Sequence, residues 1–148
     1  MSGHNITAWS VNESEVQVGS TITYPDAGFF LSLDAGITRD GLAWFLESGG
    51  RGNPDISWFD TGGSPIGKIS VPHEESRVIA VGEEAVIYLC GTHRNRRPEC
   101  LALEPGDDEP LWQVQLEGRT AVVGGALVPG LFYVATQDGG LYAIGAGL

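Results

Sequence analysis

Positive charge is scarce in this sequence. Lys and Arg together number 8 against 19 Asp and Glu residues, which gives a formal net charge of −11, and Lys68 is the only lysine. Proteins that bind nucleic acid carry a basic stripe along the binding face. The only dense basic segment here holds Arg94, Arg96 and Arg97. We therefore expect no nucleic-acid partner.

Long apolar runs are also missing. The most apolar segment, residues 121–135, is shorter than the roughly 20 residues that a membrane-spanning helix needs. Gly124-Gly125 and Pro129-Gly130 interrupt this segment, so it predicts two strands joined by a turn. The N-terminus lacks the basic region and apolar stretch of a secretory signal. We expect no membrane span and no signal peptide in this chain, and neither observation assigns a compartment.

Stretches long enough for extended helices are few, because 22 Gly and 8 Pro residues punctuate the 148-residue chain. Both residues disfavour helix interiors. The longest stretch without either is 4–18, and its Ile, Val, Thr and Trp content favours strands. With 42% hydrophobic residues the chain can build a core. The sequence predicts a single all-β domain over residues 1–148.

Thirteen short strands are predicted, each bounded by turn residues. Such a pattern is typical of a sandwich, a barrel or a propeller. The expected strands are residues 5–11, 15–24, 29–33, 42–47, 56–60, 66–71, 77–81, 85–90, 99–104, 111–116, 120–123, 131–136 and 141–144.

An internal repeat distinguishes among these folds. Residues 86–114 form one unit, and an earlier unit over 42–69 matches it. The first half of the 86–114 unit recurs over 131–144. Tyr88 precedes Tyr133 by 45 positions and Asp60 precedes Glu104 by 44. A period of about 40–45 residues with four short strands per unit is the signature of propeller blades, in which Trp112 would lie near the outer strand and cover an edge. A β-sandwich is the alternative.

The repeated motif resembles a known family. It consists of an apolar strand, an Asp-Gly turn, a Leu-Tyr-Ala-Leu-like strand, an acidic residue, a Gly-containing turn and Leu-Trp. The best matches are residues 134–144, and residues 100–104 followed by Leu111-Trp112. This pattern resembles the PQQ-like β-propeller repeat of quinoprotein dehydrogenases and of outer-membrane assembly scaffolds of the BamB type. The resemblance is clear over 84–148, weaker over 40–72 and faint before that, and it implies blades rather than an activity.

The predicted blades are too few for a ring. We expect a half blade over 1–26, full blades over 27–72 and 73–117, and a three-stranded piece over 118–148, whereas closed propellers have about four to eight blades. Three explanations are open. The chain is part of a larger protein, or a second copy or partner chain completes the ring, or the sheets form a compact stack.

Cys90 and Cys100 flank an Arg-rich hairpin loop and form either a disulfide or two free thiols. Alignment to the shorter hairpin at Asp138-Gly139 would place them one residue out of register, which disfavours a disulfide. Two cysteines without Cys-x-x-Cys spacing do not indicate zinc. The loop residues Arg94, Arg96 and Arg97 are a candidate contact for an acidic partner or for another copy.

No catalytic constellation is visible. His4, His73 and His93 are scattered and expected to be solvent-exposed loop residues, and residues 107–109 are expected to form a solvated acidic turn. The sequence therefore predicts no catalytic, metal or cofactor-binding residue and no cofactor.

The leading prediction for function is a non-enzymatic propeller-type scaffold or protein-binding module. One alternative is a fragment of a PQQ-dependent dehydrogenase. There the resemblance implies PQQ held between a tryptophan and an adjacent cysteine pair, with calcium below, but Cys90 and Cys100 are not adjacent. Another alternative is a structural virion or cell-surface assembly protein.

Overall fold

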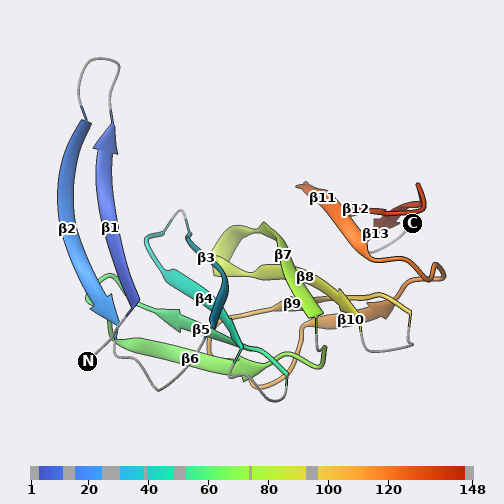
Figure 1. The fold of residues 1–148 in the computed structure, drawn as a ribbon, viewed down its shortest axis with the longest axis horizontal. Helices are drawn as coiled ribbons and strands as arrows, with labels where there is room; N and C mark the ends of the chain where they lie inside the picture. The colour runs from blue at the N-terminus through green and yellow to red at the C-terminus, as the bar shows by residue number, and fades with distance from the viewer. Residues whose placement is uncertain are drawn as a thin grey trace.

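The computed structural model describes residues 4–11, 16–24, 31–38, 40–48, 53–73, 75–92 and 97–145, with the side chains of those from residue 34 onward except Ser48. The protein is all-β (Figure 1). The described residues contain one short 3₁₀ helix, η1 (Glu83–Ala85), and no helix is long and apolar enough to cross a membrane.

The strands form four antiparallel sheets. An N-terminal hairpin joins β1 (His4–Val11) to β2 (Val16–Tyr24). The first sheet contains β3 (Leu31–Ile37), β4 (Ala43–Ser48), β5 (Asp55–Phe59) and β6 (Pro65–Ser70) in that order. The second contains β7 (Glu75–Val81), β8 (Ile87–Thr92), β9 (Glu99–Leu103) and β10 (Trp112–Gln115). The third contains only β11 (Val122–Val128), β12 (Leu131–Thr136) and β13 (Leu141–Ile144).

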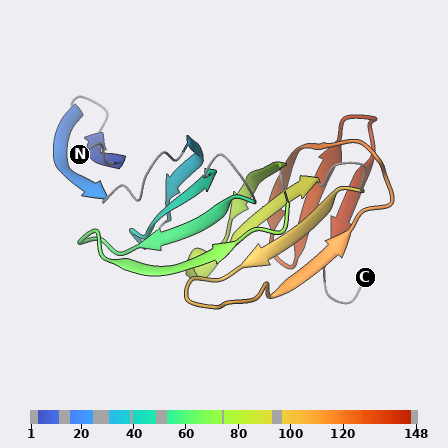
Figure 2. The same cartoon turned by 60° about the horizontal axis from the view of Figure 1, so that its bottom comes forward.

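The three larger sheets follow one another face to face (Figure 2). One apolar cluster lies between the first and second sheets and includes Trp58 and Leu101, both fully buried. Another lies between the second and third sheets and includes Phe132 and Val134. The second sheet packs against the first sheet on one face and against the third on the other, and both of its faces carry apolar side chains. This stack is compatible with propeller blades, and the described residues do not close a ring.

The first strands of the three larger sheets lie along one side of the stack. The first strands β3, β7 and β11 contact one another in sequence. The last strand of one sheet then leads directly to the first strand of the next, as β6 leads to β7 and β10 to β11. The same connectivity places β2 immediately before β3. Among the residues that the structure describes, the N-terminal hairpin pairs only with itself, and it lies at the opposite end of the molecule from β13 (Figures 1 and 2).

Most predicted strand ends lie within two residues of the observed ends, and two strands extend much further than predicted. β3 continues to Ile37 instead of ending at residue 33, and β11 continues to Val128 instead of ending at residue 123. Ala85 belongs to η1 rather than to a strand. Gly125 lies so close to the Tyr133 carbonyl that a side-chain methyl group would collide with it. Glycine at this position therefore permits close strand pairing, whereas the sequence pattern suggested a break.

Candidate binding site at the open end of the third sheet

Equivalent positions in the three sheets are identified by strand register. In the first sheet Trp44 pairs with Trp58, which pairs with Gly67 on β6. In the second sheet the corresponding row is Tyr88, Ala102 and Trp112. In the third sheet the row contains Tyr133 and Ala143 and then ends, because no fourth strand pairs with β13 among the described residues. Facing residues in a sheet share a side, so the first two rows face the next sheet in the stack and the third row faces outward.

The interface between the first and second sheets is closed at the fourth strand. Gly67 lies against the turn between β9 and β10, and a Cβ atom built on it would lie 2.8 Å from the Gly106 nitrogen. Ile69, two residues further along β6, is 7% exposed. The turn and fourth strand of the second sheet therefore cover the fourth strand of the first.

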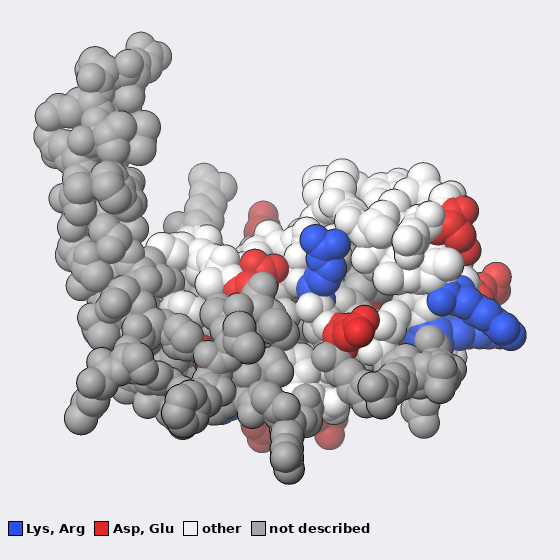
Figure 3. Space-filling model, in the orientation of Figure 1, with Lys and Arg blue, Asp and Glu red and all other residues white. Residues whose placement is uncertain are grey.

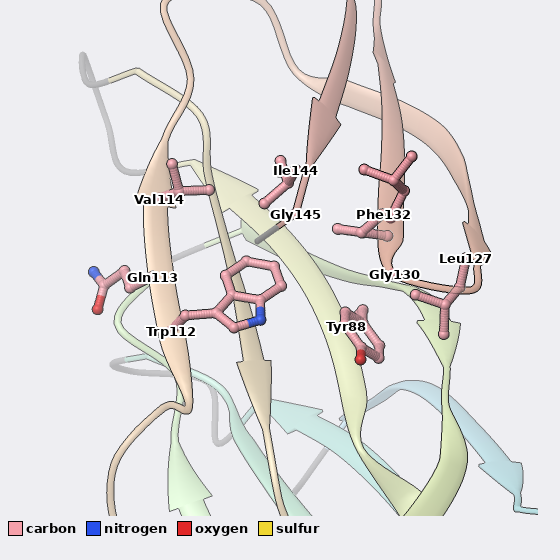
Figure 4. A pocket seen from close by; sticks show the side chains of 10 residues that line it. Tyr88, Trp112, Gln113, Val114, Leu127, Gly130, Phe132, Ile144 and Gly145 are labelled. Carbon is pink, nitrogen blue, oxygen red and sulfur yellow. The ribbon is translucent and has the colours of Figure 1, made fainter. Parts of the chain in front are cut away.

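The interface between the second and third sheets is open at the same place. A cavity of about 460 Å³, which we call the Trp112 pocket, lies between β10 and the ends of the three strands of the third sheet. Its lining residues are Tyr88, Trp112, Gln113, Val114, Leu127, Gly130, Leu131, Phe132, Ile144 and Gly145. Figure 4 shows Trp112 and Val114 on one side of the pocket, Phe132 and Ile144 on the other, and Gln113 pointing away.

Aromatic rings form the floor of this pocket. The centroids of Tyr88 and Phe132 are 5.2 Å apart, those of Tyr88 and Trp112 6.0 Å, and those of Trp112 and Phe132 6.2 Å. These separations lie within the range of favourable aromatic contacts. The three side chains support one another and form an apolar site of a size typical of binding pockets.

The outer face of the third sheet is apolar as well. It presents Tyr133 beside Ala143 and Ala135 beside Leu141, whose exposed fraction is 73%. In the preceding sheets the equivalent pairs contact the next sheet, and Trp58, Ala102 and Cys100 are fully buried there. Figure 3 shows an uncharged surface at the position of β11–β13, with acidic and basic side chains only at its margin. The outer face of the third sheet is therefore apolar and exposed, whereas the next sheet covers the equivalent faces of the first and second sheets.

A second cavity, of about 650 Å³, adjoins the Trp112 pocket at the ends of the first strands. It is lined by Ile37, Val81 and Val128 among others, and it shares Tyr88 and Leu127 with the Trp112 pocket. The hollowed surface thus continues from β10 to the ends of β3, β7 and β11, where Thr38 and Glu83 make it more polar.

A disulfide joins Cys90 to Cys100 beneath this region. The two residues lie directly opposite each other on β8 and β9, with their Cα atoms 4.1 Å apart, and both are buried. The predicted one-residue offset is wrong. The register is set by the strand pairs, such as Tyr88 with Ala102, and the longer loop of this hairpin leaves that register unchanged.

His73 is fully buried, so the prediction of solvent exposure is wrong for this histidine. It lies between β6 and β7, where the absence of a side chain on Gly91 leaves room for it. Its Nε2 atom is 2.7 Å from Glu99 Oε1, which also accepts a hydrogen bond from Gln113 Nε2 at 2.6 Å. This cluster ties the start of β7 to β9 and β10. The side chain of His4 and all of His93 lie outside the described residues.

The other candidates from the sequence do not converge on the pocket. Arg94 and Arg96 lie outside the described residues, and Arg97 is exposed. Residues 107–109 are exposed, as predicted. Within the described part of the chain, no group of three or more His, Cys, Asp or Glu side chains is placed to hold a metal ion.

Asp138 organises the turn between β12 and β13. The Thr136 hydroxyl donates a hydrogen bond to Asp138 Oδ1 at 2.6 Å. This bond, and a second from Thr120, lower the pKa of the Asp138 carboxyl below its ordinary value of 3.8. Gly139 occupies the left-handed region with φ of 88°, which completes the tight turn. The turn fixes β13 beside β12 and so positions the open edge.

The Trp112 pocket is not among the sites that the sequence predicts. The sequence places Trp112 near the outer strand, where it would cover an edge, and predicts no residue that lines a cavity. One feature of the sequence could have indicated the pocket. The last unit has three predicted strands, so no fourth strand of that unit would cover the fourth strand of the unit before it. No protein-family model and no curated protein sequence matches the chain.

Proposed function

We propose that this protein is a non-enzymatic β-propeller-type binding module that takes an extended segment of a protein partner at the open end of its third sheet. The observation that supports this proposal is the position of the Trp112 pocket. The pocket extends to Ile144 at the end of β13, whose outer edge has no partner strand among the described residues, so one bound strand could reach both.

The binding mode follows from the chemistry of a sheet edge. An unpaired strand presents backbone N–H and C=O groups that pair with an added strand, and pockets for alternate side chains give the selectivity. A strand beside β13 would direct every second side chain toward Trp112 and Val114. Burying one medium-sized apolar side chain there would contribute about 1.5–3 kcal/mol. The partner segment is therefore an extended strand with apolar residues at alternate positions.

The resemblance to the PQQ-like repeat supports the scaffold function through its architecture. Scaffolds of this type present edges and loops on a rigid frame, and the disulfide and the His73–Glu99 contact stiffen the frame here. We propose no enzymatic role, because the described residues that line the pocket are apolar or aromatic except for Gln113.

The test uses a synthetic peptide that alternates Val and Thr over six positions between terminal lysines. Titrated into the isotope-labelled protein, it should give saturable NMR shifts at the amides of residues 141–144 and at the Trp112 indole. The Ile144→Lys variant should weaken binding at least tenfold, because it places a charge in the pocket. Leu141→Lys is the matched control, on the same strand but on the opposite face, and should bind like the wild type. Shifts that do not saturate, or that lie away from β10 and β13, would refute the proposal.

A further inference from the structure

The Trp112 pocket and the second cavity form one groove whose lining carries a single charge. The two cavities share Tyr88, Leu127 and Gly130 (Figure 4). Among the described residues that line them, Glu83 is the only charged one, and it lies in the second cavity. The whole chain has a formal net charge of −11. A segment that follows this groove from the Trp112 pocket therefore meets apolar walls and then one carboxylate, and charge complementarity favours a cation there.

A constrained turn holds Glu83 in this place. Two backbone hydrogen bonds close the turn between β7 and β8: the Gly82 N–H donates to the Val86 oxygen at 2.8 Å, and the Val86 N–H donates to the Glu83 oxygen at 3.1 Å. Glu84 and Ala85 both adopt left-handed backbone conformations, with φ of 54° and 61°. Such conformations are costly outside glycine and are concentrated at ligand-binding sites and switches. The fold thus keeps a strained turn where it presents a carboxylate to the groove.

The same turn supports the aromatic floor of the Trp112 pocket. A Cβ atom placed on Gly82 would lie 2.8 Å from the Tyr88 ring, so this ring packs directly over the backbone of the turn. Tyr88 also contacts Trp112 and Phe132 across the floor. Packing therefore fixes the position of the turn, and of Glu83 within it, relative to the pocket.

The direction of a strand bound at β13 determines which of its ends can reach Glu83. Both strand pairs of the third sheet are antiparallel, and an antiparallel neighbour of β13 would begin beside Ile144. The next residue, Gly145, lies against the turn between β11 and β12, since a Cβ atom placed on it would lie 2.5 Å from the Gly130 oxygen. Gly130 lines both cavities. The residues that precede the bound strand therefore lie where the groove leads to Glu83.

Strand spacing sets the length of this connection. A strand added to β13 would lie three strand spacings from β11, or about 14 Å, which about four extended residues span. We infer that the partner segment carries a lysine or arginine about four residues before the residue that fills the Trp112 pocket, and that Glu83 binds this side chain. The inference rests on the proposed function and specifies the partner of the same site.

The experiment compares two peptides that contain the Val/Thr core and have the same composition. One carries Lys-Ser-Gly-Ser before the core and the other carries Ser-Gly-Ser-Lys after it, and acetyl and amide groups remove the terminal charges. Both are titrated into the isotope-labelled full chain at low ionic strength. The first peptide should bind about twofold to fivefold more tightly, as expected for an exposed ion pair. It should also shift the amides of residues 82–84, and added salt should reduce its advantage.

The second peptide is the control for general attraction to an acidic protein. It has the same charge, but antiparallel pairing places its lysine at the opposite end of β13. Glu83→Gln should abolish the difference between the two peptides. Glu75→Gln is the matched variant, because Glu75 is also exposed and lies at the end of β7 away from the groove, and it should preserve the difference. Circular dichroism should show the wild-type fold in both variants, since both side chains are exposed.

Two outcomes overturn the inference and leave the proposed function standing. They are equal affinities of the wild type for the two peptides, and an advantage of the first peptide that persists in Glu83→Gln. In both cases the shifts at residues 141–144 and at the Trp112 indole would still report binding at the open end. If neither peptide shifts these signals, the proposed function falls and the inference falls with it.

Discussion

Reduction of the Cys90–Cys100 disulfide should lower the stability of the protein by an amount set by the loop that it closes. The two residues are 10 positions apart. The chain-entropy relation for a loop of that length gives about 2.7 kcal/mol in the free energy of unfolding at 25 °C. The unfolding entropy near 60 °C is about 2.1 cal/mol/K per residue, or about 310 cal/mol/K for 148 residues. The expected decrease in Tm is therefore about 9 °C.

The assay compares oxidised protein with protein that has been reduced in denaturant and refolded with reductant present, because both cysteines are buried. Differential scanning calorimetry measures Tm for each form. The Cys90→Ala/Cys100→Ala variant is the control and should give the same Tm with and without reductant. Oxidised and reduced wild-type protein that melt within 2 °C of each other would refute the loop-closure reasoning.

Three further changes test the core, a turn and a titrating group. Leu101→Ala should lower the free energy of unfolding by about 2–5 kcal/mol, measured by urea denaturation, because Leu101 is fully buried between the first two sheets. Gly139→Ala should cost about 1–2 kcal/mol in the same assay, because φ is 88° at this residue. The pKa of Asp138, measured by NMR titration, should lie below 3.8 and rise in Thr136→Val, which removes the main hydrogen bond. The stabilising contribution of this carboxylate is present above pH 3.8 and is lost as pH falls through the lowered pKa.

Each of these predictions has a result that contradicts it. Leu111→Ala, at a half-exposed position, should change stability by less than about 0.5 kcal/mol, and an equal loss in Leu111→Ala and Leu101→Ala would contradict the assigned core. No atom lies within 4 Å of a Cβ placed on Gly139, so an unchanged stability in Gly139→Ala would show that its backbone strain is relieved. An Asp138 pKa that is unaffected by Thr136→Val would exclude the threonine hydroxyl as the cause.

The strands were predictable because Gly and Pro mark their ends in this sequence. The ranges 131–136 and 141–144 match β12 and β13 residue for residue. The prediction failed where a residue type has two physical roles. Gly125 marked a break in the sequence pattern, but in the fold it lies within β11 against the Tyr133 carbonyl. Local composition does not distinguish a glycine that ends a strand from one that allows close packing.

The site depends on relations between sheets, which explains why the sequence indicated so little of it. His73 lies in a connection and carries no local sign of burial, yet the stack covers it completely. Trp112 and Ile144 are 32 residues apart in the chain and line one pocket. Among the described residues, no fourth strand of the third sheet covers β10. Strand counting could have indicated the place of the pocket, but not its shape or its aromatic lining.

The face-to-face stack also has a consequence for local opening. In the described part of the chain, the core clusters join each of the three larger sheets to its neighbours in the stack, as in repeat proteins whose stability is a sum of unit and nearest-neighbour terms. Within those residues the second sheet has two such neighbours and an internal disulfide, whereas the third has one neighbour. Amide hydrogens of β8 and β9 should therefore exchange only on global unfolding. Those of β12 and β13 should exchange through a smaller opening of the third sheet alone.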